Sequence, residues 1–190
     1  MPYRRREDGK IAVTIDSNVW NWFFDRDVRL LEVLPSSRFL LFIPRHIEIE
    51  LEAIPGTKAE LKAYIEHEAA DAGVRDTATF GFAPQDGGPE RHAGFGLGTF
   101  QSEDERNFYA AVRARFLLGR PTRGSKLTDN EADAAVAAAS LSSVVLTLDA
   151  VKAGPLRAAL DHGGKVLDMR AFERTEVPLA EFIERFHAAP

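Results

Sequence analysis

Short, uninterrupted apolar runs separated by helical segments constrain the fold of this chain more than any other feature. Residues Ile11–Ile15, 38–43 and 144–148 form such runs, each of strand length and rich in β-branched or aromatic side chains. Strands that are apolar on both faces belong to sheets that are covered on both sides, and intervening helices favour parallel strands with right-handed crossovers. We therefore expect an α/β fold, a three-layer α/β/α sandwich around a mainly parallel sheet.

Helices are expected between and after these runs. Pro44 suits the first position of a helix that ends at Pro55. Capping boxes, in which Ser or Thr precedes Glu by three residues, predict further helices that start near Thr57, Ser102 and Thr128. The remaining expected elements are helices at 19–34 and 156–162, a short strand at 165–167, and a last helix from about residue 178.

Length and composition are typical of one domain. The chain has 190 residues, and a domain holds roughly 150. We expect an N-terminal tail at 1–10, a single domain at 11–190, and within it a Gly/Pro-rich insertion at about 76–101 that forms a long surface loop or lid. The chain has no cysteine, which excludes disulfides and thiolate zinc sites and is compatible with a cytoplasmic location.

The sequence predicts neither a secretory signal nor a membrane partner. The first ten residues contain no apolar segment of the kind that precedes a signal cleavage site. The longest uncharged apolar stretch, 134–148, is shorter than the roughly 20 residues that a membrane span requires.

Two aspartates directly follow expected strands. Asp16 comes after Ile11–Ile15, and Asp149 comes after 144–148. Ligands of an open parallel sheet bind at the carboxyl ends of its strands, so both carboxylates would open into one crevice. Capping of the next helix is the simpler explanation for either aspartate alone, but the two together favour a site.

Two further acids are expected on helices. Asp133 is followed by an alanine-rich run in the otherwise apolar helix expected at about 129–141, where a buried carboxylate needs a partner or a metal ion. Asp129 lies four residues earlier on the same face, although the helix dipole explains it more simply. Glu50 is expected to share the apolar stripe of Ile47, whereas Glu48 lies off that stripe.

Four carboxylates in one crevice need positive charge among them. Mg²⁺ and Mn²⁺ take oxygen ligands, acidify a bound water and neutralise charge on a phosphoryl group, so phosphodiester hydrolysis is the expected chemistry. Asn18 and Thr147 are expected to orient a ligand carboxylate or the water, and satisfaction by the backbone explains them equally well. The expected catalytic residues and metal ligands are Asp16, Glu50, Asp133 and Asp149.

Four short motifs occur in series along the chain. They are TIDSN at 14–18, PRHIEIEL at 44–51, D-x-x-V-A-A-A from Asp133, and L-T-L-D ending at Asp149. Together they resemble a PIN domain, from Ile11 to about Asp168. The resemblance implies a Rossmann-like sandwich and a metal-dependent nuclease that cuts single-stranded or structured RNA, with the family's acidic quartet on the same four residues. Leu148 stands where the family usually has Asn, and the 76–101 segment exceeds the compact toxin-type members.

A basic segment precedes the Asp133 helix. Between Glu105 and Asp129 the chain has no acidic residue and several cationic ones. A phosphate backbone can track along such a segment, and a solvated helix face followed by a loop explains it equally well. The candidate RNA-binding residues are Arg113, Arg115, Arg120, Arg123 and Lys126.

The sequence therefore predicts a Mg²⁺- or Mn²⁺-dependent endoribonuclease with an RNA substrate. One alternative is the toxin of a toxin–antitoxin pair, with the same chemistry restrained by an antitoxin or another regulatory protein. The other is a catalytically inactive PIN-like module that binds RNA or protein. The alanine-rich helix and the C-terminal helix with Phe182 and Phe186 are candidate homodimer faces, and equally candidate core elements.

Overall fold

A parallel sheet forms the centre of the computed structural model. The structure describes residues 3, 6–77, 102–117, 127–128, 130–150 and 152–189, and the backbone alone at 79–80 and 92–93. Within these residues, five parallel strands pair in the order β3-β2-β1-β6-β7. Their bounds are β1 (Ile11–Ile15), β2 (Phe39–Ile43), β3 (Arg75–Asp76), β6 (Val144–Thr147) and β7 (Val166–Asp168).

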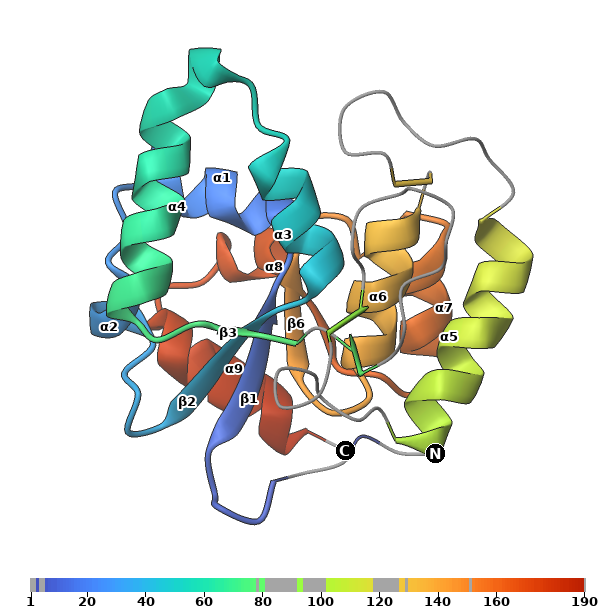
Figure 1. The fold of residues 1–190 in the computed structure, drawn as a ribbon. Coiled ribbons are helices and arrows are strands. Elements are labelled where there is room, and N and C mark those ends of the chain that lie inside the picture. The colour runs from blue at the N-terminus through green and yellow to red at the C-terminus, as the bar shows by residue number, and fades with distance from the viewer. Residues whose placement is uncertain are drawn as a thin grey trace.

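Helices cover both faces of this sheet, which confirms the expected three-layer α/β/α sandwich. Helices α5, α6 and α7 pack on one another, and α4 packs on α1 and α2. Figure 1 shows these two groups on opposite sides of the molecule, with α9 crossing behind β1 and β2. The helices are α1 (Ser17–Asp25), α2 (Leu30–Val33), α3 (Arg45–Glu52), α4 (Ala59–Asp71), α5 (Glu103–Phe116), α6 (Glu131–Ala139), α7 (Pro155–Asp161), α8 (Met169–Phe172) and α9 (Leu179–Ala188).

The core is built from the apolar runs that predicted the strands. Every residue of β1 and β6 is buried. Helix α6 buries most of its alanines inside the chain, and Phe182 and Phe186 of α9 pack against the same core. The two helices named as candidate homodimer faces therefore pack these apolar side chains against the core of their own chain, with Phe182 and Phe186 half-buried.

The helix expected at 19–34 is broken after α1. Asp27 adopts a left-handed backbone with φ 49°, a conformation that Asp tolerates better than most residues. The amides of Asp27 and Val28 donate to the carbonyls of Phe24 and Phe23, at 3.1 and 3.0 Å. These bonds form a Schellman-type end, which stops α1 and turns the chain into α2.

The capping box predicted at Ser102 is confirmed, and the one predicted at Thr57 is wrong. At the start of α5, Ser102 Oγ accepts from the Glu105 amide at 3.2 Å, and the Glu105 carboxylate accepts from the Ser102 amide at 2.8 Å. At Thr57 the chain forms a 3-10 turn over Gly56–Lys58, and α4 begins at Ala59 without a side-chain cap.

The box expected at Thr128 is half formed. The Glu131 carboxylate accepts from the Thr128 amide and hydroxyl, at 2.8 and 2.9 Å. Helix α6 begins only at Glu131, because Asn130 before it has a left-handed backbone with φ 63°. Asp133 therefore lies in the first turn of α6.

Most of the predicted insertion at 76–101 lies outside the described residues. The described part adds β4 (Thr79–Phe80) and β5 (His92–Ala93), which pair in parallel. In the predicted tail, Arg6 forms an ion pair with Asp8, and Lys10 Nζ donates to the Ser36 carbonyl at 2.8 Å. Among the described helices, none combines the length and the apolar composition needed to cross a membrane.

Candidate functional site

Two of the predicted carboxylates lie at the carboxyl edge of the sheet. Asp16 directly follows β1, and its amide donates to the Leu146 carbonyl of β6 at 3.1 Å. Asp149 lies two residues beyond the end of β6. Because β1 and β6 are neighbouring parallel strands, both aspartates leave the sheet at the same edge (Figure 1).

The Asp16 carboxylate is both a helix cap and a part of this site. It is 2% exposed. Its Oδ1 accepts from the Ser17 amide at 2.7 Å and caps α1. Its Oδ2 accepts from Thr147 Oγ at 2.7 Å and from Asn18 Nδ2 at 2.9 Å. The sequence offers helix capping and membership of a site as alternative explanations of Asp16, and in the structure both apply.

Asn18 and Thr147 connect the two aspartates. The Thr147 hydroxyl also accepts from the Asp149 amide at 3.0 Å. Asn18 Nδ2 lies 3.5 Å from Asp149 Oδ2, and Asn18 Oδ1 accepts from the Leu148 amide at 3.0 Å. Leu148 thus contributes its backbone to the site. The structure places both supporting residues where they orient the carboxylates.

Glu50 and Asp133 approach the same edge from α3 and α6, which pack on each other. Burial raises the pKa of Glu50 to about 7, against a hydrogen bond from the Ser17 side chain, and repulsion from Asp16 and Asp133 adds to the rise. Burial, and then repulsion from Asp149, raise the pKa of Asp133, and the positive charge of Lys152 opposes that rise.

The causes of the pKa shifts of Asp16, Glu50 and Asp133 link these acids and Asp149 in one electrostatic cluster. Burial raises the pKa of Asp16 to about 6, with further repulsion from Asp133 and Asp149. Asp16, Asp133 and Asp149 each raise the pKa of another acid of the group, and Glu50 is itself raised by Asp16 and Asp133. Perturbed carboxylates gathered at the ligand-binding edge of a parallel sheet are typical of functional sites.

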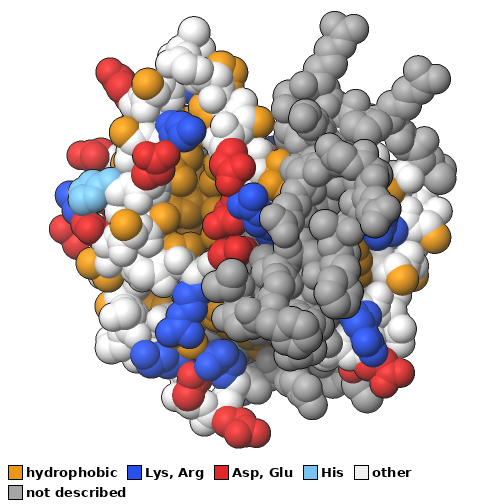
Figure 2. All heavy atoms as spheres, in the orientation of Figure 1, with side chains coloured by type: hydrophobic (Ala, Val, Ile, Leu, Met, Phe, Trp, Pro, Cys, Tyr) orange, Lys and Arg blue, Asp and Glu red, His pale blue; other side chains and the backbone are white. Residues whose placement is uncertain are grey.

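The choice of Glu50 over Glu48 rests on the register of α3, and the structure separates the two. Glu48 forms an ion pair with Arg45 at 3.0 Å, and Arg45 also pairs with Glu52 at 2.9 Å. Figure 2 shows acidic and basic side chains gathered over α3 on this face. Glu50 is half-buried and points to the Asp16 region instead.

Two cations that the sequence did not single out contact Asp149. Lys152 Nζ lies 2.6 Å from Asp149 Oδ1, and Arg170 Nη2 lies 3.7 Å from the same atom. Arg170 is in α8, just after β7, the neighbour of β6 in the sheet. The signal that could have found Arg170 is its position three residues after the strand expected at 165–167.

The donor set suits a hard divalent cation, since carboxylate oxygens are the ligands that Mg²⁺ and Mn²⁺ take. Among the described residues, no three His, Asp or Glu side chains converge on one ion position as they are placed. Both oxygens of Asp16 accept hydrogen bonds, and Asp149 Oδ1 faces Lys152. Positive charge among the four acids would relieve their repulsion, so the chemistry of the residues fits a metal ion.

A second network ties the helices that carry Glu50 and Asp133. His46, one turn before Glu50, is buried, and its Nε2 lies 3.4 Å from the Tyr109 hydroxyl and 3.7 Å from Glu131 Oε1. Glu131 is two residues before Asp133 and is also buried. The network fixes α3 against α5 and α6, and thereby the spacing of the two acids.

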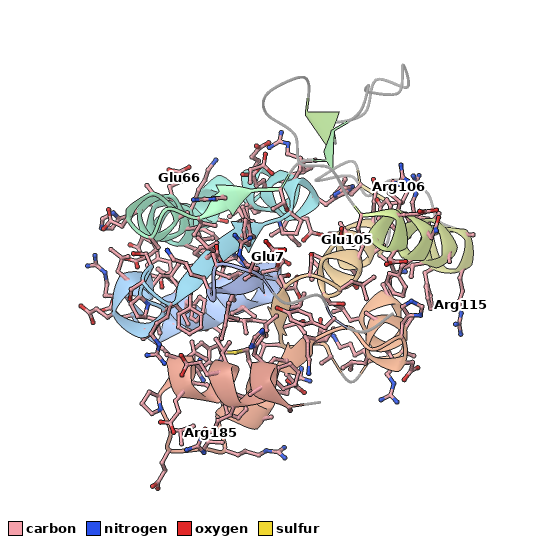
Figure 3. The ribbon with its side chains drawn as sticks, turned by 90° about the horizontal axis from the view of Figure 1, so that it is seen from below. Glu7, Glu66, Glu105, Arg106, Arg115 and Arg185 are labelled. Carbon is pink, nitrogen blue, oxygen red and sulfur yellow. The ribbon has the colours of Figure 1, made fainter. Side chains whose placement is uncertain are left out.

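The structure describes only part of the predicted RNA-binding segment. Arg113 lies over the Tyr109 ring at 5.6 Å and Arg115 over the Phe116 ring at 4.9 Å. Figure 3 shows Arg106 and Arg115 on α5, on the opposite side of the molecule from Glu66 of α4. The other candidates lie outside the described residues: Arg120, Arg123, Lys126 and the supporting acid Asp129.

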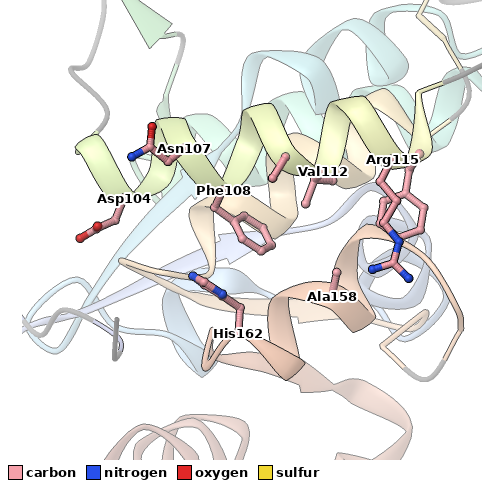
Figure 4. A pocket seen from close by; sticks show the side chains of 9 residues that line it. Asp104, Asn107, Phe108, Val112, Arg115, Ala158 and His162 are labelled. Carbon is pink, nitrogen blue, oxygen red and sulfur yellow. The ribbon is translucent and has the colours of Figure 1, made fainter.

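Arg115 also lines a groove of about 500 Å³ between α5 and α7. Figure 4 shows Phe108 and Val112 of α5 facing Ala158 and His162 across it. None of the four acids lines this groove, so it is separate from the carboxylate cluster.

No protein-family model matches this chain, and the curated proteins give no match to it either.

Proposed function

We propose that this protein is a Mg²⁺- or Mn²⁺-dependent endoribonuclease of PIN type. The observation that carries the proposal is the clustering of four acids from four segments of the chain at the carboxyl edge of the sheet. Burial and repulsion within the cluster raise the pKa values of Asp16, Glu50 and Asp133. Such an arrangement opposes stability, which favours a functional reason for it.

Asp133 gives the clearest support for the binding of a cation at this site. Among the described residues it has no hydrogen-bond or ion-pair partner, although it is half-buried in the first turn of α6. A half-buried carboxylate without a partner is costly, and a ligated cation offsets that cost.

The residues of the site take distinct roles in this proposal. Asp16, Asp133 and Asp149 hold the ion, which when bound supplies an acidified water and neutralises charge on the phosphoryl group. Thr147 and Asn18 keep the Asp16 and Asp149 carboxylates in orientation through their hydrogen bonds. Glu50 has a pKa of about 7, close to a neutral working pH, and is suited to position a water and accept its proton.

Cleavage of an end-labelled single-stranded RNA tests the proposal. The assay compares Mn²⁺, Mg²⁺ and EDTA for the wild type and for Asp149→Asn, with Asp161→Asn as the control. Asp161 is an exposed aspartate of α7 that pairs with Arg157. We expect metal-dependent cutting that Asp149→Asn loses by at least about 100-fold and that Asp161→Asn retains.

Two results would contradict the nuclease. One is undiminished cutting by Asp149→Asn, and the other is no cutting by a folded wild type that binds Mn²⁺. The second result would favour a PIN-like module that binds RNA or protein without hydrolysis.

A further inference from the structure

The strand register places a cationic corner beside the carboxylates. Thr147 of β6 is paired with Asp168 of β7. Asp149 and Arg170 each lie two residues beyond this pair, so the segments that follow β6 and β7 leave the sheet side by side. The Asp168 carboxylate accepts from the Arg170 amide at 2.9 Å and caps α8, which fixes the backbone from which Arg170 projects.

Two cations share one carboxylate oxygen at this corner. Lys152 Nζ and Arg170 Nη2 lie 2.6 and 3.7 Å from Asp149 Oδ1. One carboxylate carries one negative charge, so this group of three side chains has a net positive charge. Neutralisation of Asp149 alone requires only one of the two cations.

Both cationic side chains are open to solvent. The side chain of Lys152 is 66% exposed and that of Arg170 is 45% exposed. Exposed ion pairs contribute only about 0–1 kcal/mol to stability, so the packing of the fold does not depend on them. Their amine and guanidinium groups can reach a ligand at the sheet edge without rearrangement of the core.

We propose that Lys152 and Arg170 bind the phosphate of the substrate RNA on the β6–β7 side of the site. This inference rests on the proposed nuclease function and names the residues that draw an anionic substrate to a cluster of four acids. Arginine binds phosphate through a planar fork of donors, and lysine binds it as a point charge. On binding, the two cations would leave Asp149 and contact phosphate oxygens instead, so the Asp149 carboxylate would be available to hold a metal ion.

The test is the affinity of a fluorescein-labelled single-stranded RNA, measured by anisotropy in Ca²⁺ at several salt concentrations. The variants are Lys152→Gln, Arg170→Gln and the double variant. Arg157→Gln is the matched control, because Arg157 is an exposed cation that pairs with Asp161 of its own helix. Calorimetric titration with Mn²⁺ measures metal binding by the same proteins in the absence of RNA.

We expect each single variant to lose about 5- to 30-fold in RNA affinity. The slope of log K against log salt should become shallower by about one for each cation removed. Mn²⁺ affinity should stay the same or increase, because Asp149 loses a competing partner. Arg157→Gln should match the wild type in every measurement.

Unchanged RNA affinity and salt slope in the double variant would overturn the inference, even if the wild type cuts RNA. A parallel loss of Mn²⁺ and RNA affinity would also overturn it, because the two residues would then support the metal site only. A wild type that binds no RNA would overturn this inference and the proposed function together.

Discussion

At the scale of the residue, Asp16 shows how much the buried carboxylates of the site reduce the free energy of unfolding. Its carboxylate is 2% exposed, and burial raises its pKa from 3.8 to about 6. That difference corresponds to about 3 kcal/mol, a large part of the roughly 5–15 kcal/mol that holds a domain folded. The hydrogen bonds from Thr147, Asn18 and the Ser17 amide stabilise the charged form of this carboxylate and offset part of the cost of its burial.

The first prediction follows from the sign of this pKa shift. A carboxyl group whose pKa is raised by folding destabilises the protein above its unfolded pKa, so the free energy of unfolding should fall as the pH rises from about 4 to 6. In EDTA, Asp16→Asn should remove about 3 kcal/mol of that fall, measured by urea denaturation at a series of pH values. Asp25→Asn, an exposed aspartate at the end of α1, is the control. Parallel profiles for the wild type and Asp16→Asn would contradict the argument.

The second prediction separates the role of Thr147 in the site from its role in the core. Thr147→Val removes the donor to Asp16 and the acceptor of the Asp149 amide. Thr14→Val is the matched change, because Thr14 is a buried strand threonine whose hydroxyl lies 2.6 Å from Ser143 Oγ. Both should cost about 1–3 kcal/mol in the free energy of unfolding. Only Thr147→Val should weaken Mn²⁺ binding, by about 10-fold, and equal Mn²⁺ affinities in the two variants would argue against it.

At the scale of the element, α6 is fixed at both ends. At its start, Asn130 Nδ2 donates to the Phe116 carbonyl of α5 at 3.3 Å. At its end, the Lys165 amide donates to the Ser140 carbonyl at 2.9 Å, which joins the helix to the turn before β7. The alanine-rich middle allows close packing against α5 and α7. Asp133 is therefore held in place by packing along the whole helix.

The third prediction concerns Gly164, in the turn before β7. A Cβ there would overlap Ser140 Oγ and lie 3.1 Å from the Ala159 carbonyl oxygen. Gly164→Ala should cost about 1–3 kcal/mol in urea denaturation. Adding Ser140→Ala should recover part of that loss. The double variant should therefore lose less free energy of unfolding than the two single variants lose in total.

Gly56→Ala is the control for this change, because a Cβ at Gly56 meets nothing within 4 Å. Strict additivity between Gly164→Ala and Ser140→Ala would show that the contact between the two positions does not limit the packing of α6.

At the scale of the whole molecule, the sequence predicts the layers better than the contacts. The continuous apolar runs identify β1, β2 and β6 as strands of a covered sheet, with β1 and β6 buried throughout and β2 alternating between buried and half-buried residues. Strand β3 escapes prediction because Arg75 and Asp76 are exposed at the sheet edge. The break after α1 depends on one left-handed residue, Asp27, which periodicity does not report.

In the candidate site, too, the sequence indicates the four acids but not the side chains that contact them. The carboxyl ends of the strands indicate Asp16 and Asp149, and helical spacing indicates Glu50 and Asp133. The contacts of Lys152 and Arg170 with Asp149 could not be predicted, since they depend on the β6–β7 register and on the turn that Asp168 caps. His46 likewise gains its role only from the packing of α3 on α6.

The central claim is that four acids from separate elements form one cation site, and calorimetric titration of metal-free protein with Mn²⁺ tests it most directly. The comparison is between the wild type, Asp133→Asn and Asp161→Asn, since Asp133 reaches the cluster from α6 and not from the end of a strand, and Asp161 is an exposed aspartate of α7. We predict that the wild type and Asp161→Asn bind Mn²⁺ alike and that Asp133→Asn binds at least about 10-fold more weakly. Equal affinity in Asp133→Asn, or no binding by the folded wild type, would contradict the shared site.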